Sequence, residues 1–453
     1  MPVPAAYAAR YVYHFTDLSN LENVLTHGLL SCNEQRRLGL THKSIAESSI
    51  QDRRSRMPVT CGPGGVVHDY VPLYFGKTSP MLLKQVSAKN VDQPLIVYFV
   101  FAIQLVERGD VVFTNAAANT VVPPTFFSDP SDLVQLNWPV IDSRKWASDV
   151  ATKQARMAEV LVHRALNPGE AAYLVVWNDA IEGEVRKVYA SRGLTPPRIG
   201  RSTAADGGYY FTNFRPELPD DMRNRSLASG PIFTKGDYKE SLANVLANRG
   251  RQGAARFANV YDLLAALRVD LAALPETAEL IGLGSNNEMH TETVGDHTLR
   301  VVDECRELFT SAPLAPAEQQ LVELAAYLHD IGKGPKSRWS RCAGGKQQVD
   351  PDHPIKSTNM LERILTQDVR TITDDEARIL CKLVCYHDLY GDIVGRDRRR
   401  EQLSDIAEND RDLEMLITIG RADMTSVRET WGVVGDAQAT ELRNWVLQQW
   451  RGG

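Results

Sequence analysis

The chain has 453 residues, of which 43% are hydrophobic and 24% are charged, which is a globular composition. Because this length exceeds what one hydrophobic core usually organises, two or three domains are expected. The formal net charge of −6 excludes a surface that is basic throughout, so any nucleic-acid site has to be a local groove.

The N-terminus, the apolar runs and the cysteines predict a cytoplasmic protein with no membrane segment. The N-terminus, MPVPAAYAARYVYHF, lacks a basic segment followed by a long apolar run, so no signal peptide is expected. The most apolar run, 94–103, has the length of a buried strand. The six cysteines are scattered, and Cys381 and Cys385 lie one helical turn apart, which predicts reduced and mostly buried thiols.

Residues 1–215 predict a domain that mixes short strands with short helices. Residues 11–16 predict a strand, and residues 20–28 predict a short helix that begins at Ser19 or Asn20 and ends at Gly28. Glycine and proline punctuate residues 61–76, which predicts a fixed loop that leads into a strand. Further strands are expected at 94–103, 109–113 and 172–177, with a helical or strand-entry segment near 151–166.

The pattern changes near residue 215. Residues 216–237 carry prolines and polar residues without a clear period, which predicts a linker. From 238 to 453 the apolar residues follow helical spacing, as in Leu263, Leu264, Leu267, Val269 and Leu271. A second, all-helical domain is therefore expected to follow the first.

Three clusters of polar and aromatic residues stand out in the first domain. They are residues 13–16 with Asn20 and Gly28, residues 50–54 with the block 69–81, and residues 154–162, where Glu159 is the lone carboxylate. Each cluster has a structural alternative when taken singly. His14 is then a structural histidine, Arg53 and Arg54 are solvated surface charges, and Glu159 lies on a helix surface.

Taken together, the clusters resemble the DarT family of NAD-dependent DNA ADP-ribosyltransferases over about the first 200 residues. The matching motifs are an H-x-T opening, IQxRR, HDYVPxYFxxxSPM and the glutamate of AExLV. The resemblance implies an α+β ADP-ribosyltransferase fold in which a split antiparallel sheet cradles NAD. It also implies a DNA base as acceptor, with thymidine in single-stranded DNA the usual case.

The resemblance implies catalytic roles for Glu159 and Arg54. Cleavage of the nicotinamide–ribose bond passes through an oxocarbenium-like species, which the Glu159 carboxylate would stabilise. Proton acceptance is attributed to the family position that matches Arg54, but an arginine suits stabilisation of a deprotonated thymine better than it suits a base. Arg53 is the less favoured holder of that role. The predicted NAD-binding residues are His14, Phe15, Thr16, Asn20, Gly28, Arg53, Tyr74 and Phe75.

Aromatic and basic residues of the same domain predict a groove for a single strand, because a base inside a duplex is out of reach. The alternative is that these aromatic residues belong to the core. The candidates are Tyr70, Tyr74, Phe126, Phe127 and Trp138, with Lys77, Arg144 and Lys145 nearby.

The second domain carries histidines and aspartates spaced along its helices. The candidate metal ligands are His297, His329, Asp330, His353, His387 and Asp423. Nitrogen and oxygen donors of this kind suit manganese, iron, nickel or zinc, with manganese or iron the easier fit. The number of donors suffices for two ions, and Asp330 is the residue most able to bridge them.

From Leu274 to about residue 425 the chain resembles the HD superfamily of metal-dependent phosphohydrolases, and most of all the HD region of bacterial tRNA nucleotidyltransferases. There an HxE segment, here His290 and Glu292, precedes the first ligand. The resemblance implies hydrolysis of a phosphomonoester or phosphodiester. No nucleotidyltransferase head is present, so the tRNA substrate is not carried over. Lys333 and the basic loop could receive phosphate, although the loop suits solvated surface equally well; its residues are Lys336, Arg338, Arg341 and Lys346.

The leading hypothesis is a DNA-modifying ADP-ribosyltransferase, a toxin or anti-phage effector, with an HD hydrolase in the same chain. An alternative makes the HD domain the main enzyme, acting on nucleotides, with a degenerate N-terminal sensor. A third is a non-catalytic nucleic-acid-binding module, against which the acidic net charge argues. The family resemblance implies a macrodomain antitoxin, which would be a separate protein because no macrodomain-like glycine-rich segment is evident.

Overall fold

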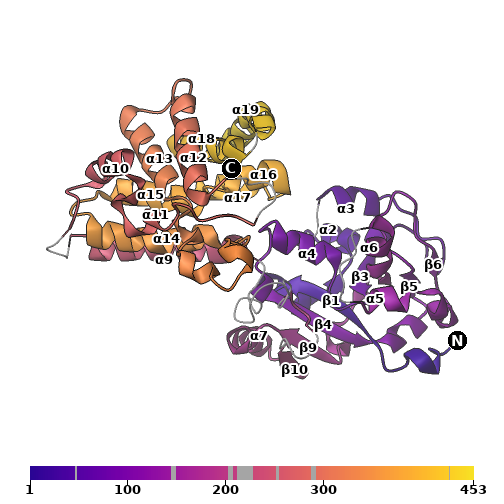
Figure 1. Cartoon of the computed structure of the whole chain (residues 1–453). Coiled ribbons are helices and arrows are strands. Elements are labelled where there is room, and N and C mark those ends of the chain that lie inside the picture. The colour runs from indigo at the N-terminus through magenta and orange to yellow at the C-terminus, as the bar shows by residue number, and fades with distance from the viewer. Residues whose placement is uncertain are drawn as a thin grey trace. The chain divides into compact units, whose positions relative to one another are not determined.

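The computed structural model of the chain divides into two compact units (Figure 1). The first unit holds the described residues up to 211 except 88–90, and the second holds 88–90 and those from 228 onward. The structure describes residues 1–453 except 46–47, 144–148, 202–207, 212–227, 251–254, 287–291, 428 and 453.

The predicted linker, 216–237, lies partly outside the described residues. Its last part is a helix, because α9 spans Pro231–Asn248. The proline at the start of α9 suits a first helical turn, and Thr234 and Tyr238 are buried. This packing makes residues 231–237 part of the helical unit, and not linker as predicted.

The first unit is built on an eight-stranded sheet in the order β10-β9-β4-β1-β3-β7-β5-β6, with a separate pair β2-β8. Neighbouring strands are antiparallel except β10 and β9, which are parallel. Between β1 and β3 the register joins one pair of residues, Tyr13 and Tyr74, so the sheet is split there. The predicted α+β class with a split sheet is confirmed, and β10 adds a parallel edge.

The strands are β1 Tyr11–Asp17, β2 Leu29–Leu30, β3 Tyr70–Tyr74, β4 Ile96–Ala102, β5 Val111–Thr114, β6 Phe126–Phe127, β7 Glu159–His163, β8 Ala165–Leu166, β9 Tyr173–Val176 and β10 Ile199–Arg201. The helices of this unit are α1 Leu21–His27, α2 Cys32–Arg37, α3 Ser48–Arg54, α4 Pro80–Ser87, α5 Trp138–Ile141, α6 Val150–Arg156 and α7 Asp179–Ser191. The predicted strands at 11–16, 94–103, 109–113 and 172–177 are confirmed with small shifts of their ends.

Strand β4 explains why the sheet is buried on both faces. Val97, Phe99 and Phe101 belong to one hydrophobic cluster. Ile96, Tyr98 and Val100 belong to another. Because side chains alternate along a strand, a run of apolar residues without polar interruption supplies both cores at once.

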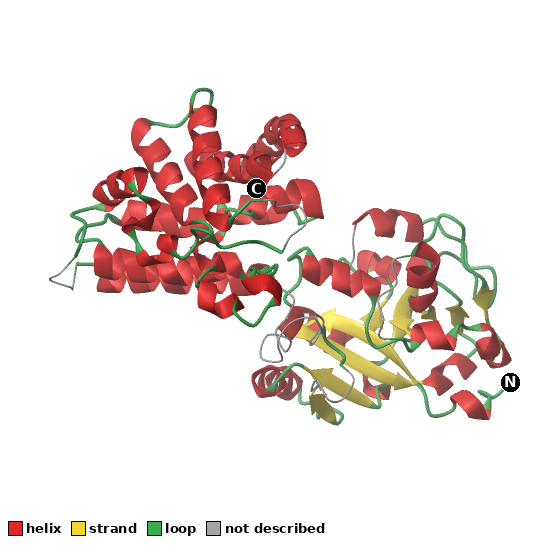
Figure 2. Cartoon of the chain, in the orientation of Figure 1, coloured by secondary structure: helices red, strands yellow, loops and turns green. Residues whose placement is uncertain are grey.

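The regular elements described in the second unit are all helices, joined by loops (Figure 2). Its helices are α9 Pro231–Asn248, α10 Val260–Val269, α11 Pro275–Ala278, α12 Val294–Phe309, α13 Pro316–Leu328, α14 His353–Arg363, α15 Asp374–Cys385, α16 Leu389–Arg396, α17 Glu401–Ile406, α18 Asp410–Val427 and α19 Glu429–Gly452. This confirms the predicted all-α class.

The predicted apolar stripe of α10 is only partly buried. Leu263, Leu264 and Leu267 join the core of the second unit. Val269 is 89% exposed because the helix ends at this residue and its side chain leaves the buried face. Among the described helices, none is long and apolar enough to cross a bilayer.

A buried ion-pair cluster joins α15 to α18 and makes a test of the fold. The Asp412 carboxylate lies 2.7 Å from Nη1 of Arg378 and 2.5 Å from Nζ of Lys382. The Lys382 side chain is 2% exposed, and its other partner, Glu408, is largely exposed. Asp412→Ala should therefore leave a buried cation poorly paired and lower the free energy of unfolding by about 3 kcal/mol.

The measurement is urea unfolding of the intact chain, followed on the transition of the second unit. Asp405→Ala is the matched control, because Asp405 is exposed near the end of α17 and should change the free energy by less than about 0.5 kcal/mol. Equal stability of the two variants would show that the cluster does not stabilise the fold.

Candidate active sites

The first unit contains a cavity of about 400 Å³ where β1, β3 and β7 meet. Its position follows from the split between β1 and β3, because Tyr74 is both the register partner of Tyr13 on β1 and that of Glu159 on β7. The predicted residues that line it are His14, Phe15, Thr16, Asn20, Gly28, Arg54, Tyr74 and Glu159.

A buried ion pair lies in the wall of this cavity. Arg54, at the end of α3, donates from Nη1 to Glu159 Oε1 at 2.9 Å. The backbone N–H of Ala118 donates to the same oxygen at 3.0 Å. The other oxygen, Oε2, is buried and has no hydrogen-bond partner among the described residues. One carboxylate oxygen is thus fixed by the protein, and the second is available to a ligand.

The charge of Arg54 is secured by its partner. Burial alone disfavours the charged guanidinium, but the Glu159 carboxylate outweighs this effect and raises the pKa of Arg54. Arg54 therefore stays a cation at any physiological pH. It can stabilise negative charge in the cavity, and it cannot serve as a base.

Side chains of β1 are held by local hydrogen bonds. The His14 ring donates from Nδ1 to the carbonyl of Pro72 at 2.8 Å, and burial lowers the pKa of His14. The ring is thus neutral, with Nε2 as an acceptor. Asn20 donates from Nδ2 to Thr16 Oγ1 and to the carbonyl of Lys43, each at 3.0 Å. Asn20 therefore fixes both Thr16 and the segment around Lys43.

An aromatic pair covers one side of the cavity. The rings of Phe15 and Tyr74 stack with centroids 5.5 Å apart and planes 10° from parallel. Burial and the nearby Glu159 raise the pKa of Tyr74, so its hydroxyl stays protonated and can donate.

Gly28 meets a steric requirement at the end of α1. Its φ is +88°, and a Cβ there would lie 3.3 Å from the carbonyl oxygen of Leu166. Glycine therefore lets the chain turn from α1 into β2 at the cavity wall.

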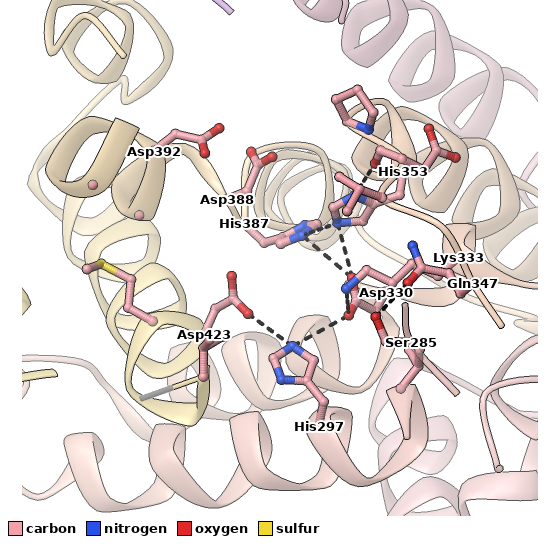
Figure 3. A pocket seen from close by; sticks show the side chains of 18 of the residues that line it. Ser285, His297, Asp330, Lys333, Gln347, His353, His387, Asp388, Asp392 and Asp423 are labelled. Atoms are coloured by element: carbon pink, nitrogen blue, oxygen red, sulfur yellow. Dashed lines mark hydrogen bonds and ion pairs between the residues drawn. The ribbon is translucent and has the colours of Figure 1, made fainter. Parts of the chain in front are cut away.

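In the second unit the six predicted ligands converge on one place, and Figure 3 labels all of them except His329. Asp330 lies at the centre. Its Oδ2 is 3.5 Å from His297 Nε2 and 3.3 Å from His329 Nε2. Its Oδ1 is 3.1 Å from His353 Nε2 and 3.9 Å from His387 Nε2. The two oxygens thus face two separate pairs of histidines.

The remaining aspartate belongs to the first pair. Asp423 Oδ1, on α18, is 3.1 Å from His297 Nε2 and 4.0 Å from His329 Nε2. The donors therefore form two groups, with Asp423 in one and Asp330 shared by both.

The four histidine rings are oriented by contacts on their far side. The Nδ1 atoms of His329, His353 and His387 donate to backbone carbonyls at 2.6, 2.8 and 2.9 Å. Nδ1 of His297 lies 3.1 Å from Ser426 Oγ, which donates its own proton to the Asp423 carbonyl. Each Nε2 is therefore an unprotonated acceptor aimed at the cluster, the arrangement that holds metal-binding histidines.

The donor set fits divalent cations. His353 Nε2 and His387 Nε2 lie 3.0 Å apart, and two lone pairs at this distance repel unless a cation lies close to both. His329 Nε2 and Asp330 Oδ1 are buried and lack a hydrogen-bond partner among the described residues. The residues present therefore suit one ion at each oxygen of Asp330.

Backbone geometry brings these ligands together. Thr293 caps α12 through reciprocal hydrogen bonds with Asp296, which places His297 in the first turn. His329 and Asp330 follow directly on α13. A Cβ on Gly332 would lie 2.3 Å from the carbonyl oxygen of His353, so the close approach of the two segments requires glycine.

Lys333 lies at the metal cluster, and Arg338 of the basic loop is held by contacts within the protein. Lys333 Nζ lies 2.5 Å from Asp330 Oδ2, at the edge of the cluster. Arg338, predicted to receive phosphate, is tied to Asp350 and donates to the carbonyl of Gly332 at 3.2 Å. The Arg338 side chain is therefore engaged within the protein. Lys336 and Lys346 of the same loop are exposed.

Comparison with known proteins yields matches for both units. Residues 13–211 match the family described as "ssDNA thymidine ADP-ribosyltransferase, DarT", and residues 294–414 match the HD domain. A DNA ADP-ribosyl transferase of Thermus sp. (strain 2.9) is 33% identical over 181 residues, which make up 39% of this chain and 86% of that protein. The chain belongs to the DarT family.

Other DarT proteins show the same pattern of coverage. The DNA ADP-ribosyl transferase of Escherichia coli O127:H6 is 25% identical over 209 residues, 44% of this chain and 93% of that protein. The solved structure of Thermus sp. 2.9 DarT in complex with ADP-ribosylated ssDNA covers 45% of this chain and 97% of its own, with 30% identity and a TM-score of 0.40. The match to the DarT family model ends at residue 211, and the match to the HD domain begins at residue 294.

Two residues predicted to bind NAD lie outside the cavity of the DarT unit. Phe75 is 3% exposed and packs edge-on against Phe113 and Trp138 in the core, on the face opposite Tyr74. Alternation along the chain explains this, because adjacent residues of an extended segment face opposite sides. Arg53 is exposed and donates to the carbonyl of Asn119 at 3.3 Å. As neighbours on α3, Arg53 and Arg54 point in different directions.

The predicted aromatic groove is mostly core. Tyr70 and Tyr74 line the cavity. Phe126, Phe127 and Trp138 are buried in hydrophobic clusters and present no stacking surface. Lys77 lies over the ring of Tyr209 at 5.0 Å, and Arg144, Lys145 and His290 fall outside the described residues.

Sequence reasoning missed a histidine of the DarT cavity. His68 is 2% exposed, lines the cavity and donates from Nε2 to Gln51 Oε1 at 2.9 Å. Its position in the HDYVP block and that of Gln51 in IQxRR are the signals that could have found the pair.

His68 makes the stability of the DarT unit depend on pH. Burial, and then the charges of Arg54 and Arg36, lower the pKa of His68 to about 4. An unfolded histidine titrates near 6.5, so between these values the unfolded chain binds a proton that the folded chain does not. The free energy of unfolding should fall as pH falls through this window. His68→Gln should remove this contribution.

The measurement is urea unfolding of wild type and His68→Gln at pH 7 and at pH 4.5, on the transition of the first unit. The stability difference, wild type minus variant, should shrink or reverse at the lower pH. His27→Gln, exposed on α1, is the control. A difference that is the same at both pH values would contradict the low pKa.

Proposed function

We propose that the DarT unit transfers ADP-ribose from NAD to thymidine in single-stranded DNA, and that the HD unit is a metal-dependent phosphohydrolase. The observation that carries the first part is the buried Arg54–Glu159 pair in the cavity wall, where Oε2 of Glu159 has no hydrogen-bond partner among the described residues. The family description and the names of the relatives support the acceptor. In a cell, such a protein would act as a cytoplasmic toxin or anti-phage effector, with a separate macrodomain protein as antitoxin.

Glu159 would act on the sugar. As the nicotinamide–ribose bond breaks, positive charge develops on the ribose, and a fixed carboxylate stabilises that charge without reorganising. Oε2 would accept a hydrogen bond from a ribose hydroxyl, while Arg54 and the Ala118 N–H keep Oε1 in place.

Arg54 would act on the acceptor. Thymine in DNA has one ring N–H, at N3, and the nitrogen becomes a nucleophile as its proton leaves. A cation beside it stabilises the negative charge that spreads over the ring. The raised pKa of Arg54 supports this role and argues against proton acceptance.

The other cavity residues would hold NAD. His14 and Thr16, fixed by Pro72 and Asn20, would line the nicotinamide end. The stacked rings of Phe15 and Tyr74 would wall the pocket.

The alternative of a degenerate sensor gains no support from the cavity. The Glu159 carboxylate could also bind a ribose hydroxyl in a protein without activity, so transfer activity is what distinguishes the enzyme from the sensor. If the wild-type protein shows no transfer activity, the degenerate sensor becomes the favoured interpretation.

The test is Glu159→Gln. It keeps the shape of the side chain but removes its charge, so transfer to DNA should fall by about 100-fold to 1000-fold while NAD binding changes little. Mass spectrometry of oligonucleotides incubated with protein and NAD measures the transfer. Glu170→Gln, on an exposed turn of the same unit, is the control and should transfer at the wild-type rate.

The same assay examines the acceptor. A thymidine-containing single strand should be labelled far more than its annealed duplex, because pairing and stacking hide the base edge. Equal labelling of both forms would refute the single-strand proposal. Labelling of guanine alone would agree with a DNA ADP-ribosyltransferase but would show that thymidine is not the acceptor.

For the HD unit, the convergence of four histidines and two aspartates supports a site for two divalent ions bridged by Asp330. Manganese or iron suits these donors best. Such an ion, when bound, polarises a phosphoryl oxygen and lowers the pKa of water. Lys333 would hold substrate phosphate. The likeness to tRNA nucleotidyltransferase HD regions is proposed from sequence alone.

Asp330→Ala removes the shared ligand. After reconstitution with manganese, elemental analysis should find up to two ions per wild-type chain and fewer in the variant, which should also lose phosphoesterase activity. ADP-ribosyl transfer should not change. Asp303→Ala, exposed on α12, is the control. A wild-type protein that takes up no metal would mean that the HD unit is a scaffold.

A further inference from the structure

The cavity of the HD unit is larger than two metal ions require. Its volume is about 360 Å³, at the lower end of what small-molecule sites offer. Besides the ligands, it is lined by a strip of α16 and the facing strip of α18. These strips consist of Gly391, Val394 and Gly395 on α16, and Met424 and Val427 on α18. We call this part of the cavity the apolar slot.

The apolar slot has the character of a site for a flat, uncharged group. Gly391 and Gly395 are one helical turn apart, so α16 presents bare backbone on that face. A Cβ on Gly391 would lie 3.1 Å from Met424 Cγ, so the two helices approach closely there. At Gly395 a Cβ would meet nothing within 4 Å, so the slot is open at that end.

Two carboxylates border the slot next to the metal ligands. Asp388 and Asp392 lie to the left of His387 in the view of Figure 3, and Lys333 lies to the right. Arg398 Nη1 is 3.3 Å from Asp388 and 3.4 Å from Asp392. Lys89, whose segment 88–90 belongs to this unit, contacts both carboxylates as well.

This wall can hold the sugar of a nucleoside. Its two carboxylates are paired with three cations, Lys89, Arg396 and Arg398. Its carboxylate oxygens can accept hydrogen bonds from ribose hydroxyls, a common use of acidic residues beside a nucleotide. The apolar slot behind it can take the base. Phosphate would instead lie at the metal ligands and Lys333.

We infer that the HD unit hydrolyses the pyrophosphate of the ADP-ribosyl group that the DarT unit attaches to DNA, with adenosine in the apolar slot. This inference rests on the proposed function of both units. The attached group consists of an adenosine phosphate joined through one P–O–P bridge to a ribose phosphate, so it carries both the nucleoside and the bond that this cavity suits. Because both units lie in one chain, each modified base forms at a raised local concentration of the HD unit.

The reaction is a hydrolysis with water as the only co-reactant. The oxygen of water bonds to the adenosine-side phosphorus, and the bridging P–O bond breaks. The bridging oxygen leaves on the ribose-side phosphate, and the two protons of the water go to the two released phosphates or to solvent. The products are AMP and DNA whose base keeps a phosphoribosyl group. No redox partner is required.

The first experiment measures binding. Wild type reconstituted with manganese is titrated with AMP and with ribose 5-phosphate, which shares the phosphate but lacks the base. AMP should bind at least about tenfold more tightly, because only AMP places apolar surface in the slot. Gly395→Leu should abolish this preference, since the added side chain fills open space in the slot. Gly236→Leu is the control, because Gly236 is an exposed glycine of helix α9.

The second experiment measures the reaction on an oligonucleotide that already carries ADP-ribose. Mass spectrometry should detect loss of AMP from the adduct with wild type and with Glu159→Gln, but not with Asp330→Ala or Gly395→Leu.

Equal affinity for AMP and ribose 5-phosphate, or AMP binding unchanged by Gly395→Leu, would overturn the assignment of the slot. If the adduct stays intact while the same sample hydrolyses bis(p-nitrophenyl) phosphate, the proposed substrate is wrong but the HD unit is still a phosphohydrolase. No metal-dependent hydrolysis of either compound would mean that the proposed function of the HD unit is wrong.

Discussion

A buried carboxylate needs a cation, and the DarT unit meets this need at the split in its sheet. Glu159 begins β7 beside Tyr74, where β1 and β3 have almost separated, and Arg54 reaches it from the end of α3. Removal of either charge would leave the other uncompensated in a low dielectric. The ion pair therefore ties α3 to the central strands. The same contact leaves Oε2 as the one oxygen that a ligand can engage.

The HD unit also contains a buried carboxylate, that of Asp330, and compensates its charge differently. The pKa of the buried Asp330 carboxyl lies far below its usual value: burial opposes this shift, and the Lys333 ammonium beside the carboxylate stabilises its charged form. Three of the four rings are anchored through Nδ1 to carbonyls of their own helix or turn. The ligand atoms are thus oriented by hydrogen bonds to the backbone, and a bound cation would relieve the repulsion between the lone pairs of His353 and His387.

The sequence predicted local patterns well and side-chain direction poorly. The spacing of His297, His329 and Asp330 along helices was sufficient to predict their convergence, because a capped helix fixes which face a residue occupies. The motif resemblance brought Arg54 and Glu159 to attention, but the ion pair between them depends on how distant segments pack. Phe75 was predicted to bind NAD but lies in the core, because adjacent residues of an extended segment face opposite sides. The shared motif contains both Tyr74 and Phe75 and does not show which of them faces the cavity. His68 was overlooked because its partner Gln51 lies in a different motif.

Each unit has hydrophobic clusters of its own among the described residues: one spans Tyr238 to Val446 in the second unit, and the rest lie between Val3 and Phe211 in the first. Because each unit has its own core, a substitution in one core is expected to leave the fold of the other unit intact. In genetic terms, the chain should yield separation-of-function alleles. Two copies of the gene, each disabled in a different unit, should complement one another in the same cell.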